Sequence, residues 1–182
     1  MKVLKVLTFV FTGLFAVFFF VKDRIVINPT ASMPIGIYWR YDKPKLERGD
    51  IVLACLPDSR ESRLFIDRGY LYGVSCPGGH GKILKTIRGI PGDKVLINRF
   101  GVLVNGERLA NSLPQSQDSL GRRMPLKNLQ TTLKEDEYIL MGEHPLSLDS
   151  RYLGPIHKVQ ILFSVRFLNL NGWDSPLPKG SV

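Results

Sequence analysis

The sequence is poor in cysteine and histidine and contains only one long apolar run. Two cysteines among 182 residues exclude a disulfide-framework protein, and a chain of this length buries a core without disulfides. Three histidines without ligand-type spacing predict no metal site, and we expect no cofactor. A single apolar run also excludes a polytopic membrane protein.

Positive charge is in excess, but it is spread along the chain. Lysine and arginine number 25 against 16 acidic residues, which gives a formal net charge of +9. No block of five like charges and no nucleic-acid-binding module accompany this excess. We therefore expect a solvated basic surface that faces the anionic lipid of the inner membrane, and no nucleic-acid partner.

The one apolar run, Val6–Val21, has no charged residue and predicts a membrane anchor over residues 1–24. As a helix it would be about 24 Å long, slightly less than the ~30 Å hydrocarbon core. Lys5 and Lys22 can snorkel, and Ile25–Ile27 can add depth, so the run predicts a single transmembrane helix.

The alternative to a retained anchor is a cleaved signal peptide. Cleavage requires small residues soon after the apolar run, and the nearest candidate, Ala31, has Pro29 two residues before it. Lys2 and Lys5 precede the run, and the basic residues after it are partly offset by Asp23. This small bias favours a cytoplasmic N-terminus, with the bulk of the chain translocated to the periplasmic side of the bacterial inner membrane.

The remainder of the chain predicts a mainly β domain over residues 25–170, followed by a tail over 171–182. Short apolar or alternating runs end at turn residues, and Asn105-Gly106 marks a tight turn. Ser59–Arg68 is the one helix candidate, with Ser59 as N-cap, and polar residues 111–134 predict a long surface loop. The predicted strands are Gly36–Tyr41, Asp50–Leu56, Lys82–Ile90, Lys94–Ile97, Val102–Val104, Glu137–Met141 and Ile161–Leu168.

The two cysteines, Cys55 and Cys76, permit one internal pairing. If the domain lies outside the cytoplasm, a disulfide is their expected state, and it would contribute about 3 kcal/mol by closing the loop around the predicted helix. The alternative is a pair of buried thiols.

Two residues suit nucleophilic catalysis. Ser32 lies shortly after the apolar run, between Pro29 and Pro34, which restrict the local backbone. A serine nucleophile needs a base, and none of the histidines has a recognisable acidic partner. Lys85 lies within an otherwise apolar strand, where burial would lower its pKa and allow it to act as that base.

An ordered set of short motifs carries a family resemblance. Ser32-Met33-Pro34 is followed by Gly49-Asp50-Ile51-Val52, then by Lys85 with Gly89-Ile90-Pro91-Gly92-Asp93, and then by Ser147-Leu148-Asp149-Ser150-Arg151. This order resembles the signal peptidase I family of Ser–Lys proteases. The stretch Ser32–Tyr38, Arg68-Gly69-Tyr70-Leu71 and Cys76-Pro77-Gly78-Gly79 most resemble its TraF branch, the conjugative-transfer peptidases.

The resemblance implies an antiparallel β-sheet catalytic domain and specific roles for its residues. Ser32 matches the nucleophile and Lys85 the general base, while the Thr30 hydroxyl and the Ser32 N–H match the oxyanion hole. Ser147 matches the hydroxyl that orients the lysine amine, and Asp149 and Arg151 match a supporting salt bridge. The sequence departs from the family at Thr86 and in Gly142–Leu146, where the family usually has arginine and an Asp-Asn-Arg segment. We expect the apolar substrate pocket to comprise Met33, Ile83, Leu84 and Ile87.

The implied function is maturation of a membrane-embedded conjugative pilin or another secreted precursor. A leader or terminal segment would be removed, with hydrolysis or head-to-tail cyclisation of the pilin as the outcome. Two alternatives stay open: a general type I signal peptidase, and a non-catalytic envelope assembly protein tethered to the membrane.

Overall fold

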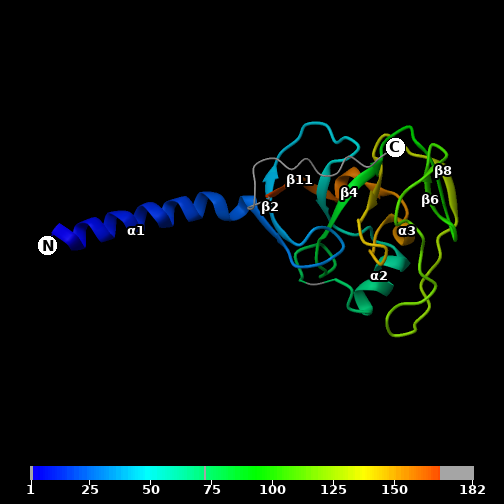
Figure 1. Ribbon diagram of the computed structural model, residues 1–182, viewed down its shortest axis with the longest axis horizontal. Helices are drawn as coiled ribbons and strands as arrows, with labels where there is room; N and C mark the ends of the chain where they lie inside the picture. Colours follow the sequence, from blue (N-terminus) through cyan, green and yellow to red (C-terminus); the bar gives the residue numbers. More distant parts are fainter. Residues whose placement is uncertain (1, 72, 169–182) are drawn as a thin grey trace.

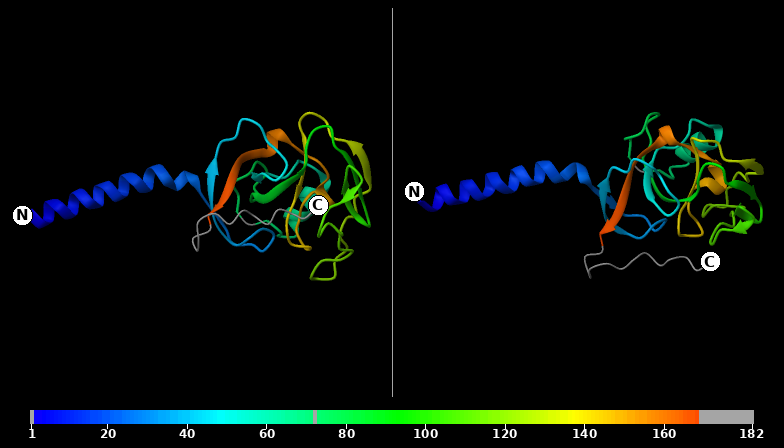
Figure 2. Two further views of the ribbon diagram at one scale, coloured as in Figure 1. Left: turned by 45° about the horizontal axis from the view of Figure 1, so that its top comes forward. Right: turned by 90° about the horizontal axis from the view of Figure 1, so that it is seen from above.

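The computed structural model describes residues 2–71 and 73–168. A long helix, α1 (Lys2–Val21), extends away from a β-rich domain, and the two further views agree on this arrangement (Figures 1 and 2). The short 3₁₀ helix η1 (Lys22–Arg24) connects α1 to the first strand. The predicted tail, 171–182, lies outside the described residues.

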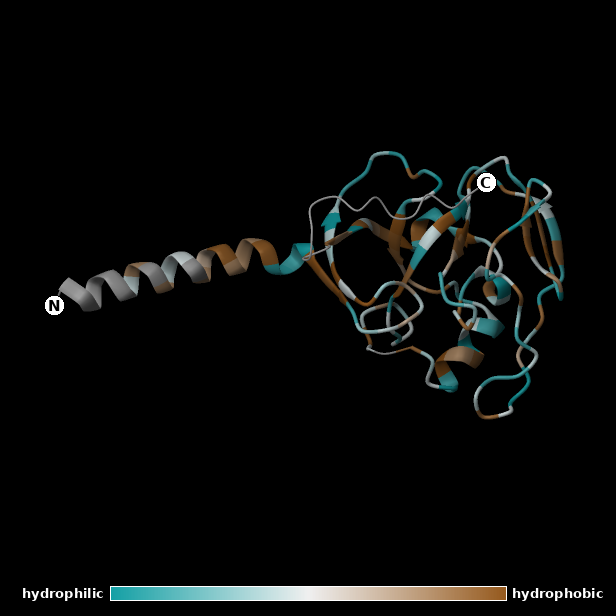
Figure 3. Ribbon diagram, viewed as in Figure 1, coloured by the Kyte–Doolittle hydropathy of each residue, from teal (hydrophilic) through white to brown (hydrophobic). Residues whose placement is uncertain are grey.

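The end of α1 that adjoins the domain is rich in apolar residues (Figure 3). Its aromatic side chains are exposed, including Phe11 at 72%, Phe18 at 62% and Phe20 at 85%. In the described part of the chain, however, no helix is long and apolar enough to cross a membrane. The predicted transmembrane helix is therefore not confirmed. The prediction that Ile25–Ile27 extend the apolar helix is wrong, because these residues form a strand paired with residues 37–39.

The domain is mainly β, as predicted, and every strand pairing in its two sheets is antiparallel. The larger sheet has the order β1-β2-β11-β3-β4-β9-β10, and the smaller has the order β7-β6-β5-β8. The larger sheet comprises β1 (Ile25–Asn28), β2 (Gly36–Tyr41), β11 (Ile161–Leu168), β3 (Ile51–Ala54), β4 (Ile83–Gly89), β9 (Glu137–Met141) and β10 (Ile156–His157). The smaller comprises β7 (Glu107–Arg108), β6 (Gly101–Val104), β5 (Lys94–Asn98) and β8 (Leu129–Thr132).

Most predicted strands are present to within a few residues, and the predicted strands Lys94–Ile97 and Val102–Val104 form the hairpin β5–β6. Asn105 and Gly106 both have positive φ, 53° and 89°, so they form the tight turn that returns the chain into β7. The predicted loop over 111–134 needs correction, because Leu129–Thr132 form β8 and pair with β5. Its Leu-Gln-Thr-Thr sequence is a weak strand signal because Leu129 is its one apolar residue, and this side chain packs against a core cluster that includes Val95 and Ile97 of β5.

Two short helices complete the domain. α2 (Arg60–Asp67) begins where predicted, and the Ser59 hydroxyl accepts a hydrogen bond from the Ser62 N–H over 3.1 Å. α3 (Ser150–Leu153) is a single turn that was not predicted. A core cluster joins the two helices to the larger sheet through Phe65, Ile87, Leu140, Tyr152 and Leu153, among others.

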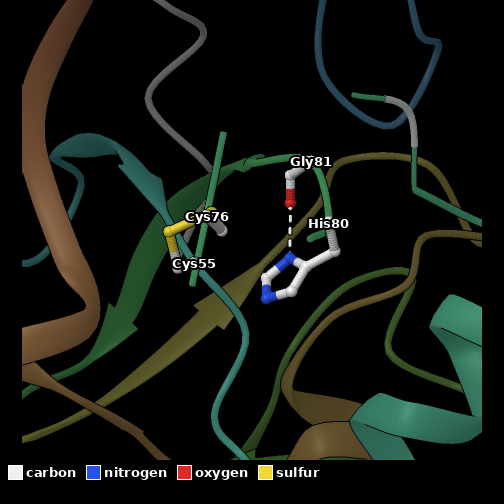
Figure 4. Close-up of a disulfide and its surroundings, with 4 residues drawn as sticks. All are labelled: Cys55, Cys76, His80 and Gly81. Carbon is white, nitrogen blue, oxygen red and sulfur yellow. Dashed lines mark hydrogen bonds between the residues drawn. A yellow bond between two sulfur atoms is a disulfide. The ribbon is translucent and has the colours of Figure 1, made fainter. Parts of the chain in front are cut away.

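Cys55 and Cys76 form a disulfide with a Cα–Cα distance of 5.8 Å, which confirms the predicted pairing. The bond joins the residue after β3 to the segment that leads back into β4 (Figure 4). In the same segment His80 is buried, and its Nδ1 lies 2.8 Å from the carbonyl oxygen of Gly81. The His80 ring therefore makes a local contact with the neighbouring backbone.

Candidate active site

Ser32 lies in a turn between β1 and β2 that is held together by a single amide side chain. The Asn28 Nδ2 group donates hydrogen bonds to the carbonyl oxygens of Thr30, Met33 and Pro34 over 2.9, 3.1 and 3.0 Å. The Tyr38 hydroxyl adds a 2.7 Å bond to the Pro34 carbonyl. Because a satisfied hydrogen-bond network rigidifies the groups that it joins, these bonds fix the backbone on both sides of Ser32.

Lys85 reaches this turn from the middle of β4. It is 3% exposed, and its Nζ lies 2.9 Å from the Ser32 Oγ. Burial lowers the pKa of Lys85 to about 8, although the nearby Asp149 carboxylate raises it and the Arg151 guanidinium lowers it. The amine is therefore far easier to deprotonate than an ordinary lysine, and it is within hydrogen-bonding distance of a serine hydroxyl.

Thr30 stands beside the same serine. Its Oγ1 lies 3.3 Å from the Ser32 Oγ and donates a 2.9 Å hydrogen bond to the Asn28 Oδ1. In this arrangement the threonine proton points to Asn28. To stabilise an oxyanion over Ser32, the hydroxyl would have to rotate away from that amide.

Ser147 is buried next to this group. Its Oγ has no hydrogen-bond partner among the described residues, although Ser147 lines the same cavity as Lys85. A Cβ on Gly142 would collide with this hydroxyl and would lie 2.8 Å from the Ser32 carbonyl oxygen. The glycine therefore allows the Ser147 and Ser32 segments to approach each other.

Asp149 and Arg151 form a fully buried ion pair that supports the other side of the site. Arg151 donates from Nε to Asp149 Oδ1 over 2.8 Å and from Nη2 to Oδ2 over 2.9 Å. The same Asp149 Oδ2 accepts the Gly142 N–H over 2.9 Å, and the next residue, Glu143, donates its N–H to the Ser32 carbonyl over 2.9 Å. The ion pair is thus linked to the serine through two consecutive backbone groups.

A cavity of about 1190 Å³ opens over Ser32 and Lys85. Two of the four predicted pocket residues, Ile83 and Leu84, line it. The prediction does not hold for Ile87, which is fully buried in the core, and Met33 lies outside this cavity although it belongs to the same core cluster as Leu84. The actual walls include residues from distant loops, such as Tyr70, Leu71, Gln115, Met124 and Leu146.

The structure thus brings together the six polar residues predicted for the site. Sequence reasoning missed Asn28 and Gly142, which organise the serine turn and the approach of Ser147. Asn28 precedes a proline at the end of an apolar run, which is a signal for a side chain that bonds to nearby backbone. Gly142 follows β9 directly, and the sequence alone gives no indication of how close it lies to Ser32.

The chain is similar in sequence to a known protein family and to several named proteins. Residues 1–169 match the family model described as signal peptidase, peptidase S26. A plasmid transfer protein TraF of Escherichia coli is 36% identical over 142 residues, which cover 77% of this chain and 80% of the relative.

Two further relatives have similar names. A probable conjugal transfer protein TraF of Sinorhizobium fredii is 34% identical, over 75% of this chain and 72% of the relative. A conjugal transfer protein TraF of Agrobacterium fabrum is 31% identical, over 71% and 73%. Among solved structures, a signal peptidase I of Enterococcus faecalis is 20% identical, with a TM-score of 0.38 over 69% of this chain and 100% of the other.

Proposed function

The chain belongs to the signal peptidase family, peptidase S26, and on that premise we propose that it is a serine endopeptidase with Ser32 as nucleophile and Lys85 as general base. One observation carries the assignment of these two residues. The Lys85 amine is buried, its pKa is lowered to about 8, and it lies 2.9 Å from the Ser32 Oγ. A neutral amine in that position can accept the hydroxyl proton as the oxygen attacks a peptide carbonyl.

The tetrahedral intermediate needs donors for its oxyanion. We assign this role to the Ser32 N–H and to the Thr30 hydroxyl, after rotation of that hydroxyl away from Asn28. One such donor contributes about 3 kcal/mol to transition-state stabilisation. The bonds from Asn28 to the surrounding carbonyls keep the Ser32 N–H in place while the charge develops.

The lysine completes the cycle. Protonated Lys85 donates its proton to the leaving amine when the C–N bond breaks, which leaves an ester between the substrate acyl group and Ser32. Neutral Lys85 then takes a proton from water, whose oxygen attacks the ester. When the C–O bond to Ser32 breaks, Lys85 returns this proton to the Ser32 Oγ. We assign to the Ser147 hydroxyl the role of orienting the amine during these transfers, because it is buried, has no hydrogen-bond partner among the described residues and lines the same cavity as Lys85.

We propose a precursor protein as the substrate, with a conjugative pilin as the specific case. The family acts on precursors, and the relatives above carry the names of plasmid and conjugal transfer proteins. The cavity of about 1190 Å³ is large enough for several residues of an extended chain. Replacement of water by the substrate's own amino end at the ester would give a cyclic product, and attack by water gives a linear one.

We further propose that α1 attaches the enzyme to the bacterial inner membrane, with the catalytic domain on the periplasmic side. Exposed aromatic residues along α1 support contact with lipid. The disulfide between Cys55 and Cys76 supports an oxidising compartment.

Co-expression with a candidate pilin precursor tests the proposed function. We expect the wild type and a Ser116→Ala control to process the precursor, and Ser32→Ala and Lys85→Ala to leave it intact. The mass of the product then separates a cyclic chain, lighter by one water, from a linear one. Processing by Ser32→Ala would refute the assignment of Ser32 as nucleophile and favour a non-catalytic assembly role. Processing of many unrelated precursors by the wild type would favour a general signal peptidase.

A further inference from the structure

A second, smaller hollow lies beside the Ser32 turn. Its volume is about 360 Å³. It is lined by Ala31, Met33, Pro34, Ile35, Glu143 and His144. Its walls are therefore the serine turn and the segment after β9, and the latter is where the sequence departs from the family pattern.

The hollow and the large cavity share the same turn but not the same residues. The Ser32 and Lys85 side chains line the large cavity, whereas the residues on either side of Ser32 line the hollow. The Glu143 N–H holds the Ser32 carbonyl over 2.9 Å, so the two walls of the hollow are joined at the nucleophile. A peptide bond placed over Ser32 with its acyl half in the large cavity can extend its other half across this turn into the hollow.

The polar groups of the hollow define what it can hold. Glu143 is exposed, and no ion pair of its carboxylate occurs within residues 2–71 and 73–168. The His144 Nδ1 accepts the Leu146 N–H over 3.1 Å, so the ring proton is on Nε2 and is available to donate. The other walls are apolar. A carboxylate above an apolar floor suits an aliphatic stem that ends in a cation, whereas the imidazole N–H can donate only to an acceptor such as a carbonyl oxygen of the peptide.

We propose that this hollow is the subsite for the first residues after the scissile bond, and that Glu143 makes it selective for lysine or arginine there. The inference rests on the proposed peptidase function, because it needs a peptide bond over Ser32. Glu143 then determines specificity, and neither it nor His144 reacts.

A peptide library tests the subsite. The full-length enzyme in detergent micelles is given peptides that vary at every position, including norleucine as an uncharged analogue of lysine, and the products are identified by mass spectrometry. We expect wild type and the exposed control Glu135→Gln to prefer lysine over norleucine after the cleaved bond by about two- to fivefold, as for an exposed ion pair. Glu143→Gln should bring this ratio to about one, and Glu143→Lys should shift the preference to acidic residues.

The outcomes separate the two proposals. Absence of any Ser32-dependent cleavage would overturn the peptidase function and the subsite with it. Ser32-dependent cleavage without a basic preference after the bond would overturn the subsite alone. A preference for basic residues that survives Glu143→Gln, or one located before the cleaved bond, would also overturn the subsite alone.

Discussion

Replacing Lys85 by methionine should abolish peptidase activity and at the same time stabilise the fold. Burial lowers the pKa of this amine from 10.5 to about 8, so the folded protein holds the ammonium form at a cost. Each tenfold loss of proton affinity corresponds to about 1.4 kcal/mol, which gives a cost of about 3 kcal/mol at pH 7. Loss of the hydrogen bond to Ser32 offsets about 1 kcal/mol of the gain. The variant should therefore be more stable than wild type by about 2 kcal/mol.

The stability difference between Lys85→Met and wild type should depend on pH. A lysine whose pKa is lower in the folded than in the unfolded state destabilises the fold below the folded pKa. That destabilisation disappears as the pH rises from about 8 to 10.5. The advantage of Lys85→Met should therefore be largest at pH 7 and should nearly vanish by about pH 9.5.

Urea unfolding of the full chain in detergent micelles at both pH values measures the effect. Lys94→Met, at an exposed position of β5, is the matched control and should show no pH-dependent difference from wild type. If Lys85→Met has no advantage at pH 7, or the same advantage at both pH values, the amine is not desolvated and the reasoning for a lysine base is refuted.

Three further predictions concern the rest of the site. In a peptide-cleavage assay, kcat/KM should rise with pH up to about 8 as Lys85 loses its proton, and a profile that falls over this range would contradict a neutral base. Gly142→Ala should lower kcat by at least tenfold, because its Cβ would collide with the Ser147 hydroxyl, whereas Gly13→Ala, which meets nothing within 4 Å, should have wild-type kinetics. Asp149→Asn should lower the free energy of unfolding by about 3–5 kcal/mol in urea titrations, because it leaves a buried guanidinium unpaired, and a change below 1 kcal/mol would contradict this.

Local pattern predicted the β architecture, and the family resemblance of the ordered motifs predicted the polar residues of the site. Alternating apolar runs are read directly as strands, and Ser59 ahead of an amphipathic segment marked α2. The ordered motifs predicted that Ser32 and Lys85 meet, although they are 53 residues apart in the chain. The hydrogen bond between them agrees with that expectation.

The features that were missed depend on tertiary contacts. Ile25–Ile27 is apolar enough to join the preceding run in a sequence reading, and only its pairing with β2 identifies it as β1. Ile87 belongs to the same strand as Lys85, but it packs into the core instead of lining the cavity. The role of Asn28 depends on three carbonyl groups whose directions follow from the turn and not from residue type.

Trapping the acyl-enzyme tests the central claim most directly. A peptide ester is mixed with the full-length protein, the reaction is quenched with acid within its first turnover, and the protein is digested and analysed by mass spectrometry. The account predicts an acyl adduct on Ser32 in the wild type and no adduct in Lys85→Met at neutral pH. An adduct on another residue, or ester turnover that continues in Ser32→Ala, would contradict it.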